Sequence, residues 1–341
     1  MTSDLVGNKT ESHQLLAIVL LSLLMITSIP PTHVTVGTVG TPESFLLDVG
    51  NTLVQSDVVM GRVDYSIINT PDAFDGYNLF VLWEESLVEP EAGNVALIMD
   101  MAGNVVAQKQ LGDIGSWHCP AEFIDPNTVL LGTTNGSALW HLETNTIEEL
   151  GFAGSHEFEY NPNSDTVFTF SADPKSIDGI DYMFETIMEY DMTGTLVWAW
   201  NVSDFIPIEW WCPYNDTGGG YRDISHGNTI YYDADDDIIF YNSRNTNTFF
   251  KLNHTSKEVI WGLGEYGNFT LYDIQGNVCD ELFYHAHSVE PIDENSFILF
   301  DNDMHNQTSE DNMISRMLEI RIDENTTKTI FVICLTMVYT S

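Results

Sequence analysis

Basic residues are the scarcest feature of this sequence. Its 341 residues include 11 lysines and arginines against 51 aspartates and glutamates, which gives a formal net charge of −40. A surface with this charge repels phosphate backbones, so we expect no nucleic-acid partner. A solvated surface adapted to salt or to the outside of a cell explains the acidity best, and an acidic site for a cationic ligand is the alternative.

Cysteine is almost as scarce. The four cysteines are Cys119, Cys212, Cys279 and Cys334, and no pair has the C-x-x-C spacing of a metal site. Disulfides are plausible in an exported protein. Four cysteines allow three complete pairings, and the sequence does not choose among them.

One long hydrophobic run stands out, from Leu15 to Ile29, between Lys9 and Pro30. It is shorter than the roughly 20 residues of a spanning helix and suits the apolar core of a signal peptide. No clear cleavage site follows, so a membrane anchor fits as well. We expect an apolar helix within residues 1–31, either signal peptide or transmembrane anchor, and an N-terminal extension over residues 32–71.

Asn-x-Ser/Thr sequons are numerous and favour an extracytosolic, glycosylated surface. Asn8 precedes the apolar run and is expected to stay unmodified. The asparagines of the eight sequons are Asn8, Asn135, Asn201, Asn215, Asn253, Asn268, Asn306 and Asn325.

Helical periodicity is rare past residue 45. Short runs rich in Val, Ile, Phe and Tyr alternate with Asn, Asp and Gly turns, which predicts an all-β fold. A strand–turn–strand unit recurs, starting at Asp100, Glu143, Asp191 and Asn253. Its first two steps, of 43 and 48 residues, fit the roughly 40–50 residues of a four-stranded propeller blade, and the third, of 62, leaves room for a loop such as Pro207 to Tyr221. We therefore predict a β-propeller over residues 72–329.

Histidines recur in register with this unit, 10 to 12 residues before an apolar strand. They are His118, His156, His226 and His287. Equivalent points of propeller blades face one axis, so we expect these side chains to meet at one end of it. A lone histidine is more often a satisfied turn residue, and the recurrence is what favours a site.

Several motifs do not point to a cofactor or a metal. Gly262-Leu-Gly-Glu-Tyr-Gly267 matches a dinucleotide fingerprint but does not open a helix. Asp233 to Asp237 lacks the twelve-residue calcium pattern. Arg244 among the histidines would repel zinc. We therefore expect no cofactor and no metal.

An ordered set of motifs resembles the PAPS-independent arylsulfotransferases over roughly residues 72–323. The stretch from His226 to Arg244 is similar to the family's H-x-N … Y-D … S-R segment. His285-Ala-His287 through Phe300-Asp-Asn302 resembles its Q-H-D … F-D-N-G segment. The other similar stretches are Asp75 to Phe80, Met101 to Val106, Asn253 to Gly264 and Ser315 to Glu319.

The resemblance implies a six-bladed propeller that transfers a sulfuryl group from an aryl sulfate to a phenol through a sulfated histidine. By register to Phe300-Asp-Asn, His287 matches the sulfated residue, and His285 is its nearest rival. Two residues apart on a strand, both side chains would face the same side. His226, Arg244 and His156 match the supporting residues. Candidates for substrate binding are His285, His118, Trp211 and Tyr284.

The sequence also departs from the family. Ala286 replaces Gln, and Asp303 replaces Gly. After Thr329 the family pattern stops, so we expect residues 330–341 to be an atypical tail and the last blade to be incomplete. Alternatives are a quinoprotein-like dehydrogenase and a non-catalytic propeller that binds glycans or proteins, because a fold alone does not fix a function.

Overall fold

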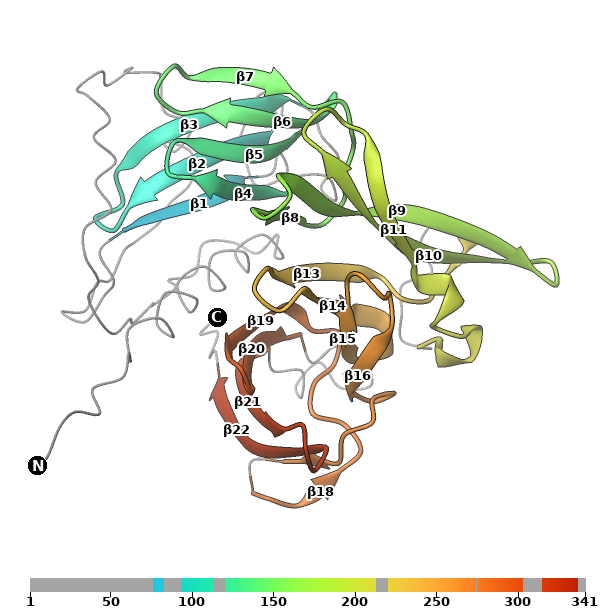
Figure 1. Cartoon of the computed structure of the whole chain (residues 1–341). Helices are drawn as coiled ribbons and strands as arrows, with labels where there is room; N and C mark the ends of the chain where they lie inside the picture. Colours follow the sequence, from blue (N-terminus) through green and yellow to red (C-terminus); the bar gives the residue numbers. More distant parts are fainter. Residues whose placement is uncertain are drawn as a thin grey trace, which may run out of the picture. The chain divides into compact units, whose positions relative to one another are not determined.

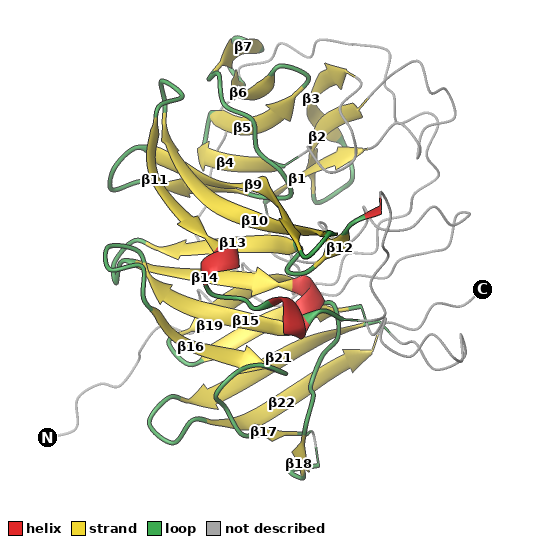
Figure 2. Ribbon diagram, turned by 90° about the vertical axis from the view of Figure 1, so that its right-hand side faces the viewer, coloured by secondary structure: helices red, strands yellow, loops and turns green. Residues whose placement is uncertain are grey.

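A computed structural model describes most of the chain beyond the N-terminal extension. In the described residues the chain forms β-strands and three-residue 3-10 helices, and no α-helix (Figure 2). None of the helices in this part is long and apolar enough to cross a membrane. The apolar run from Leu15 to Ile29 lies outside it. The described residues are 76–82, 94–112, 120–212, 220–273, 275–302 and 315–336.

Within the described residues the fold is an all-β propeller with five blades, where the resemblance implied six. Two compact units divide the chain between Gln110 and Leu111. The first unit holds a three-stranded blade of β1 (Tyr77–Leu82), β2 (Asn94–Asp100) and β3 (Val105–Gly112), paired in that order.

Four antiparallel blades make up the second unit (Figure 1), and we number them one to four within that unit. The first and second blades each pair their strands in sequence order. The strands of the first are β4 (Ala121–Asp125), β5 (Thr128–Thr133), β6 (Gly136–His141) and β7 (Thr146–Glu149). Those of the second are β8 (Phe158–Asn161), β9 (Thr166–Ile177), β10 (Ile180–Asp191) and β11 (Leu196–Asn201).

The last two blades follow the same order, and a two-stranded sheet of β17 (Leu271–Tyr272) and β18 (Val278–Cys279) lies between them in sequence. The strands of the third blade are β13 (Gly227–Asp233), β14 (Ile238–Ser243), β15 (Thr248–Asn253) and β16 (Val259–Gly264). Those of the fourth are β19 (His287–Asp293), β20 (Ser296–Asp301), β21 (Arg316–Asp323) and β22 (Lys328–Thr336).

The recurring turn predicted from the sequence joins the last two strands of each blade. Asp191 accepts hydrogen bonds from the backbone N–H groups of Thr193 and Thr195, both at 2.9 Å. Asp100 plays the same part between β2 and β3, where it binds the N–H groups of Ala102 and Asn104. A short acidic side chain that satisfies the turn backbone explains why aspartate recurs at this position.

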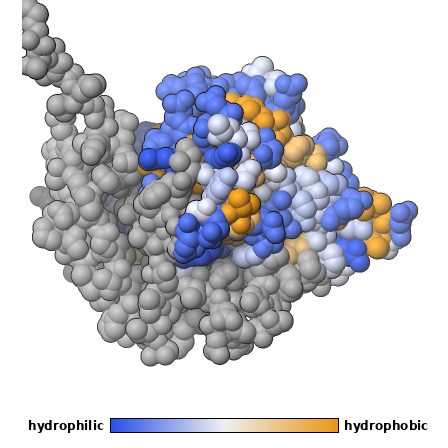
Figure 3. Space-filling view, turned by 90° about the horizontal axis from the view of Figure 1, so that it is seen from below, coloured by the Kyte–Doolittle hydropathy of each residue, from blue (hydrophilic) through white to orange (hydrophobic). Residues whose placement is uncertain are grey.

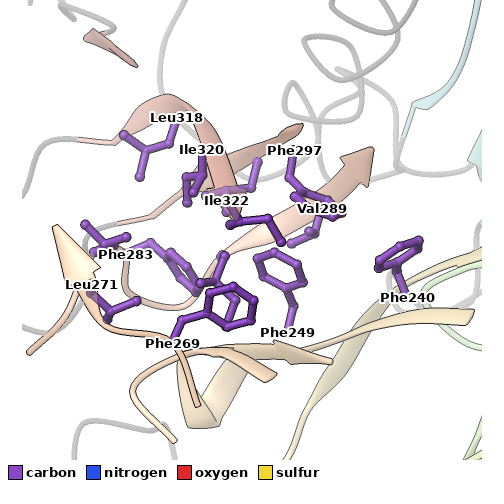
Figure 4. Packing of buried hydrophobic residues seen from close by; sticks show 14 of the residues in the cluster. Phe240, Phe249, Phe269, Leu271, Phe283, Val289, Phe297, Leu318, Ile320 and Ile322 are labelled. Atoms are coloured by element: carbon purple, nitrogen blue, oxygen red, sulfur yellow. The ribbon is translucent and has the colours of Figure 1, made fainter. Parts of the chain in front are cut away.

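Hydrophobic packing fills the space between neighbouring blades. Figure 4 shows the cluster between the third and fourth blades, where Phe249 and Phe297 lie with ring centroids 5.2 Å apart. The middle strands β14 and β20 are buried along their whole length, as expected for strands covered on both faces. On the face seen in Figure 3 hydrophilic residues cover most of the described surface, in keeping with the acidic composition.

Within the second unit, the first strand of each blade lies next to that of the following blade. Contacts join β4 to β8, β8 to β13, and β13 to β19. Inner strands that adjoin in this way bring equivalent positions of successive blades together, which is the arrangement that the histidine register predicts.

The end of the chain differs from what we expected. Residues up to Thr336 continue as β22 and pair with β21 from Asp323↔Lys328 to Arg316↔Thr336, which makes a regular four-stranded blade. The run Ile330-Phe-Val-Ile-Cys-Leu335 is rich in β-branched and aromatic residues, so it forms a strand.

The G-x-G-x-x-G match is a tight turn at the end of β16. Gly264 has a φ of 129°, which a residue with a side chain rarely adopts. A Cβ on Gly267 would lie 2.2 Å from the carbonyl oxygen of Gly262. These glycines serve the close packing of the turn, and β17 follows them.

Candidate functional site

Three of the four recurring histidines occur where inner strands begin. His156 lies two residues before β8, His226 directly precedes β13, and His287 is the first residue of β19. His156 and His226 have left-handed backbones, with φ of 64° and 48°. Such angles are uncommon without glycine and are found where the surroundings hold a residue in place. His118 lies outside the described residues.

The structure brings His156, His226, Arg244 and His287 together. The rings of His156 and His226 meet edge to face, with centroids 5.0 Å apart. Burial lowers the pKa of His287 well below its usual value, and the charges of Arg244, His226 and His156 lower it further. The imidazole of His287 is therefore neutral at physiological pH.

The backbone that carries His287 is fixed by buried asparagines. Asn228 and Asn242 both donate to the carbonyl oxygen of Ala286, at 2.9 and 2.7 Å. Asn247 accepts from the N–H of His285 at 2.9 Å. These amides come from the third blade, so packing between the last two blades sets the position of His287.

The Phe-Asp-Asn segment at the end of β20 contacts Tyr284 and His287 through its polar side chains. Asp301 accepts from the N–H of Tyr284 and from Nε of Arg316, both at 2.8 Å. Nδ2 of Asn302 lies 3.0 Å from Nδ1 of His287. The spacing that matched His287 to Phe300-Asp-Asn is thus the spacing of a hairpin in which the ring of His287 meets Asn302.

His285 and His287 contact different groups. His285 precedes β19 and has a left-handed φ of 51°, so the alternation of a strand does not apply to the pair. His285 is 1% exposed, and its Nε2 lies 3.6 Å from Sγ of Cys212, which is also buried. Its carbonyl oxygen lies 3.1 Å from Nδ1 of His287.

Arg244 begins the 3-10 helix η9 (Arg244–Thr246) that follows β14. Its backbone N–H donates to the carbonyl oxygen of His226 at 3.3 Å, and its Nη1 donates to Asn245 at 2.7 Å. Burial lowers the pKa of Arg244, against the opposing charge of Asp223. An arginine nevertheless stays cationic, so it offers a planar fork of donors to an oxyanion.

Asp223 and Cys212 are site neighbours that sequence reasoning missed. Oδ2 of Asp223 lies 2.5 Å from Nδ1 of His226. The spacing Asp-x-x-His was the available signal, but only the turn before β13 makes the two side chains meet. Trp211, a predicted aryl-binding residue, packs against the guanidinium of Arg222, which lies 4.6 Å from its ring centroid.

A second cluster consists of carboxylates, most of them on the inner strands that follow the histidines in sequence. Glu122 is on β4, Glu159 on β8 and Glu290 on β19, with Glu157 next to His156. Burial, followed by the charge of Glu157, raises the pKa of Glu122 to about 8. Burial raises the pKa of Glu290 to about 7. Nothing in the sequence indicated this cluster, because inner strands are normally apolar on the core side.

The described residues bear on metal binding and on the cysteines. No cluster of histidine, cysteine or acidic residues suited to a metal ion occurs within the described ranges. Cys279 carries a free thiol, while Cys119 and the side chain of Cys334 lie outside those ranges.

Comparison with known proteins gives one family. The model of the family described as Arylsulfotransferase (ASST) matches residues 85–333. No curated protein matches the sequence.

Solved structures resemble the chain more distantly. Hydrazine synthase of Kuenenia stuttgartiensis is 7% identical, with a TM-score of 0.42 over 73% of this chain and 61% of that one. The Cps50 (Swd1) β-propeller domain of Myceliophteria thermophila is 11% identical, with a TM-score of 0.39 over 69% and 60%. The chain thus spans less than two thirds of either structure, and at these TM-scores only the family match bears on what the chain is.

Proposed function

This chain belongs to the arylsulfotransferase (ASST) family, and we propose that it transfers a sulfuryl group from an aryl sulfate ester to a phenol through His287. One observation carries the proposal: the neutral imidazole of His287 stands among Arg244, His226 and His156. A neutral imidazole is a competent nucleophile, and the three neighbours are donors suited to sulfuryl oxygens.

The tautomer of His287 follows from its neighbours. The carbonyl oxygen of His285, 3.1 Å from Nδ1, only accepts hydrogen bonds, so Nδ1 carries the proton and Nε2 has the lone pair. The amide of Asn302 fits this tautomer with its Oδ1 turned toward Nδ1, since the oxygen and nitrogen of a side-chain amide are assigned from their partners. We therefore assign the attack on sulfur to Nε2.

Transfer then takes two steps. Nε2 of His287 forms a bond to sulfur while the bond from sulfur to the aryl oxygen breaks, and the aryl group leaves as a phenolate that a neighbouring histidine protonates. A second phenol gives its proton to that histidine as its oxygen attacks the same sulfur, and the electron pair of the N–S bond returns to His287. Arg244 and His156 hold the sulfuryl oxygens through both steps, which needs neither nucleotide nor metal.

The test is to incubate the protein with 4-nitrophenyl sulfate and no acceptor. The peptide that contains His287 should gain the mass of one sulfuryl group, because covalent transfer leaves a trapped intermediate. His287→Ala should abolish both the mass gain and turnover. His285→Ala is the matched control and should keep the label, since His285 is turned toward Cys212. A label on His285, or full activity of His287→Ala, contradicts the assignment.

A non-catalytic propeller predicts a different outcome. It would bind without releasing 4-nitrophenol, and a quinoprotein-like dehydrogenase would show the absorbance of a bound quinone. Donor identity beyond the aryl sulfate class, and the acceptor, are to be found by varying each in this assay.

We also propose an extracytosolic location for the described part of the chain. Asn135, Asn201, Asn268 and Asn325 are exposed, as glycan acceptors must be. A loss of mass on treatment of the secreted protein with an endoglycosidase supports the proposal, and an unmodified mass at all four sites contradicts it.

A further inference from the structure

Asp223 and His226 form a partly buried acid–imidazole pair beside the residues of the proposed transfer. Oδ2 of Asp223 lies 2.5 Å from Nδ1 of His226, and the two side chains are 15% and 18% exposed. A carboxylate in this position accepts a hydrogen bond from Nδ1–H. Nε2 is therefore the nitrogen of His226 that is turned to other partners.

The backbone of this pair is held on both sides. Asp223 belongs to β12 (Arg222–Asp223), a short strand that pairs parallel to β10, and the N–H of Ile224 donates to the carbonyl oxygen of Met183 at 2.9 Å. On the other side, Nδ2 of Asn245 donates to the carbonyl oxygen of Asp223 at 3.1 Å. The second and third blades thus fix where the carboxylate stands.

The ring of His226 lies close to the proposed nucleophile. It meets the ring of His156, with centroids 5.0 Å apart, and it is near enough to His287 for its charge to lower the pKa of that residue. A histidine that is oriented by a carboxylate and lies near a nucleophile is an arrangement that supports proton transfer in the transition state.

We infer that Asp223 is a positioning residue that lets His226 carry the phenolic proton in both steps. The inference rests on the sulfuryl transfer proposed above. In the first step the electron pair of the broken S–O bond stays on the aryl oxygen, which takes a proton from Nε2 of His226. In the second step Nε2 takes the proton of the acceptor phenol as its oxygen attacks sulfur. The carboxylate of Asp223 accepts the hydrogen bond from Nδ1–H in both steps and stabilises the imidazolium form of His226.

A different role for Asp223 must be separated from this one. The carboxylate also acts on the charge of Arg244, so it could serve only to hold the guanidinium. Loss of an arginine contact slows the transfer from every donor alike. Loss of a proton donor slows it most for donors whose phenol is a poor leaving group, because a stable phenolate leaves without a proton.

The experiment compares 4-nitrophenyl sulfate, which releases a stable phenolate, with phenyl sulfate, which does not. The rate of His287 labelling is measured in single turnover for the wild type, Asp223→Asn and His226→Gln. We expect both variants to lose about 100-fold or more with phenyl sulfate and less than about tenfold with 4-nitrophenyl sulfate. The double variant should be no slower than His226→Gln, since the two residues act as one unit.

Controls keep the result interpretable. Asp181→Asn changes an exposed aspartate on β10 and should leave both rates unchanged. Melting curves identify any variant that fails to fold, and Asp223→Glu, which keeps the carboxylate, should recover part of the phenyl sulfate rate. Equal losses with both donors, or no loss with either, overturn the inference. Absence of any label in the wild type instead refutes the proposed transfer itself.

Discussion

The side-chain amide of Asn302 lies 3.0 Å from Nδ1 of His287, across the hairpin of β19 and β20. The pair register of these strands places His287 opposite Phe300. The amide therefore meets the nitrogen of the proposed nucleophile that does not attack sulfur. It is suited to fix the ring and to stabilise the charge that Nδ1–H carries after sulfation.

We expect Asn302→Ala to slow labelling of His287 by about tenfold, the value of one lost hydrogen bond of roughly 1.5 kcal/mol. The rate of the mass gain with donor alone measures this. Asn277→Ala, in an exposed turn between β17 and β18, is the control. An unchanged rate in Asn302→Ala would show that the backbone of β19 alone orients His287.

The low pKa of His287 predicts an unusual pH profile. Burial, and then the charge of Arg244, keeps the imidazole neutral, so labelling by 4-nitrophenyl sulfate should persist below the ordinary histidine pKa of about 6.5. In Arg244→Met the pKa of His287 should rise, and the acid limb should move to higher pH although labelling is slower. Arg244→Lys keeps the charge, so its acid limb should stay low. If Arg244→Met and Arg244→Lys have the same acid limb in their pH profiles, the charge of Arg244 is not a cause of the low pKa of His287.

Much of this arrangement could be predicted from the sequence because it repeats. The blade turns at Asp100 and Asp191 recur, and so does the position of a histidine before an inner strand. The register from His287 to Phe300 anticipated a contact that the hairpin makes. A repeat is visible in a sequence, and equivalent positions of repeated units occupy equivalent places in the fold.

The other features of the site depend on contacts between residues that are not part of the repeating pattern. Asp223 meets His226 only because β12 pairs with β10, a parallel pairing outside the blade pattern. The carboxylates Glu122 and Glu290 come from strands far apart in sequence. The side chain of His285 lies against Cys212, and its residue precedes β19 with a left-handed φ, an angle that strand alternation cannot reveal.

His254 predicts a stability that depends on pH. Its Nδ1 and Nε2 lie 2.9 Å from Asp237 and Glu189. Although burial lowers the pKa of His254, its hydrogen bonds to these carboxylates raise it overall. A raised pKa in the folded state gives stability that is fully present below the unfolded pKa of about 6.5 and is lost as the pH rises through the folded value.

His254→Gln should therefore lower the melting temperature by several degrees at about pH 5.5, for a loss of about 2 kcal/mol, and by less at about pH 9. Melting curves at the two pH values measure the difference. His141→Gln removes an exposed histidine paired with Glu148 and should change little at either pH. A loss in His254→Gln that is the same at both pH values would mean that the charge of His254 contributes nothing.

The carboxylate cluster also predicts a stability that falls as the pH rises, but for a different reason. The raised pKa of Glu122, to about 8, means that the folded state favours its protonated form. The resulting stability is fully present below the ordinary glutamate pKa of about 4.3 and is lost as the pH rises toward the folded value. Deprotonation then places a charge near Glu157 and Glu159, whose pKa values are raised by burial as well.

Glu122→Gln keeps the shape of the side chain but cannot ionise. We expect it to raise the melting temperature by several degrees at about pH 9, where the wild type must hold the charge, and to change it little at about pH 5. Glu148→Gln, at an exposed position on β7, is the matched control and should have no such dependence. If Glu122→Gln is destabilising at the higher pH, the ionised carboxylate is a favourable part of the fold, and the cause assigned here to its raised pKa is wrong.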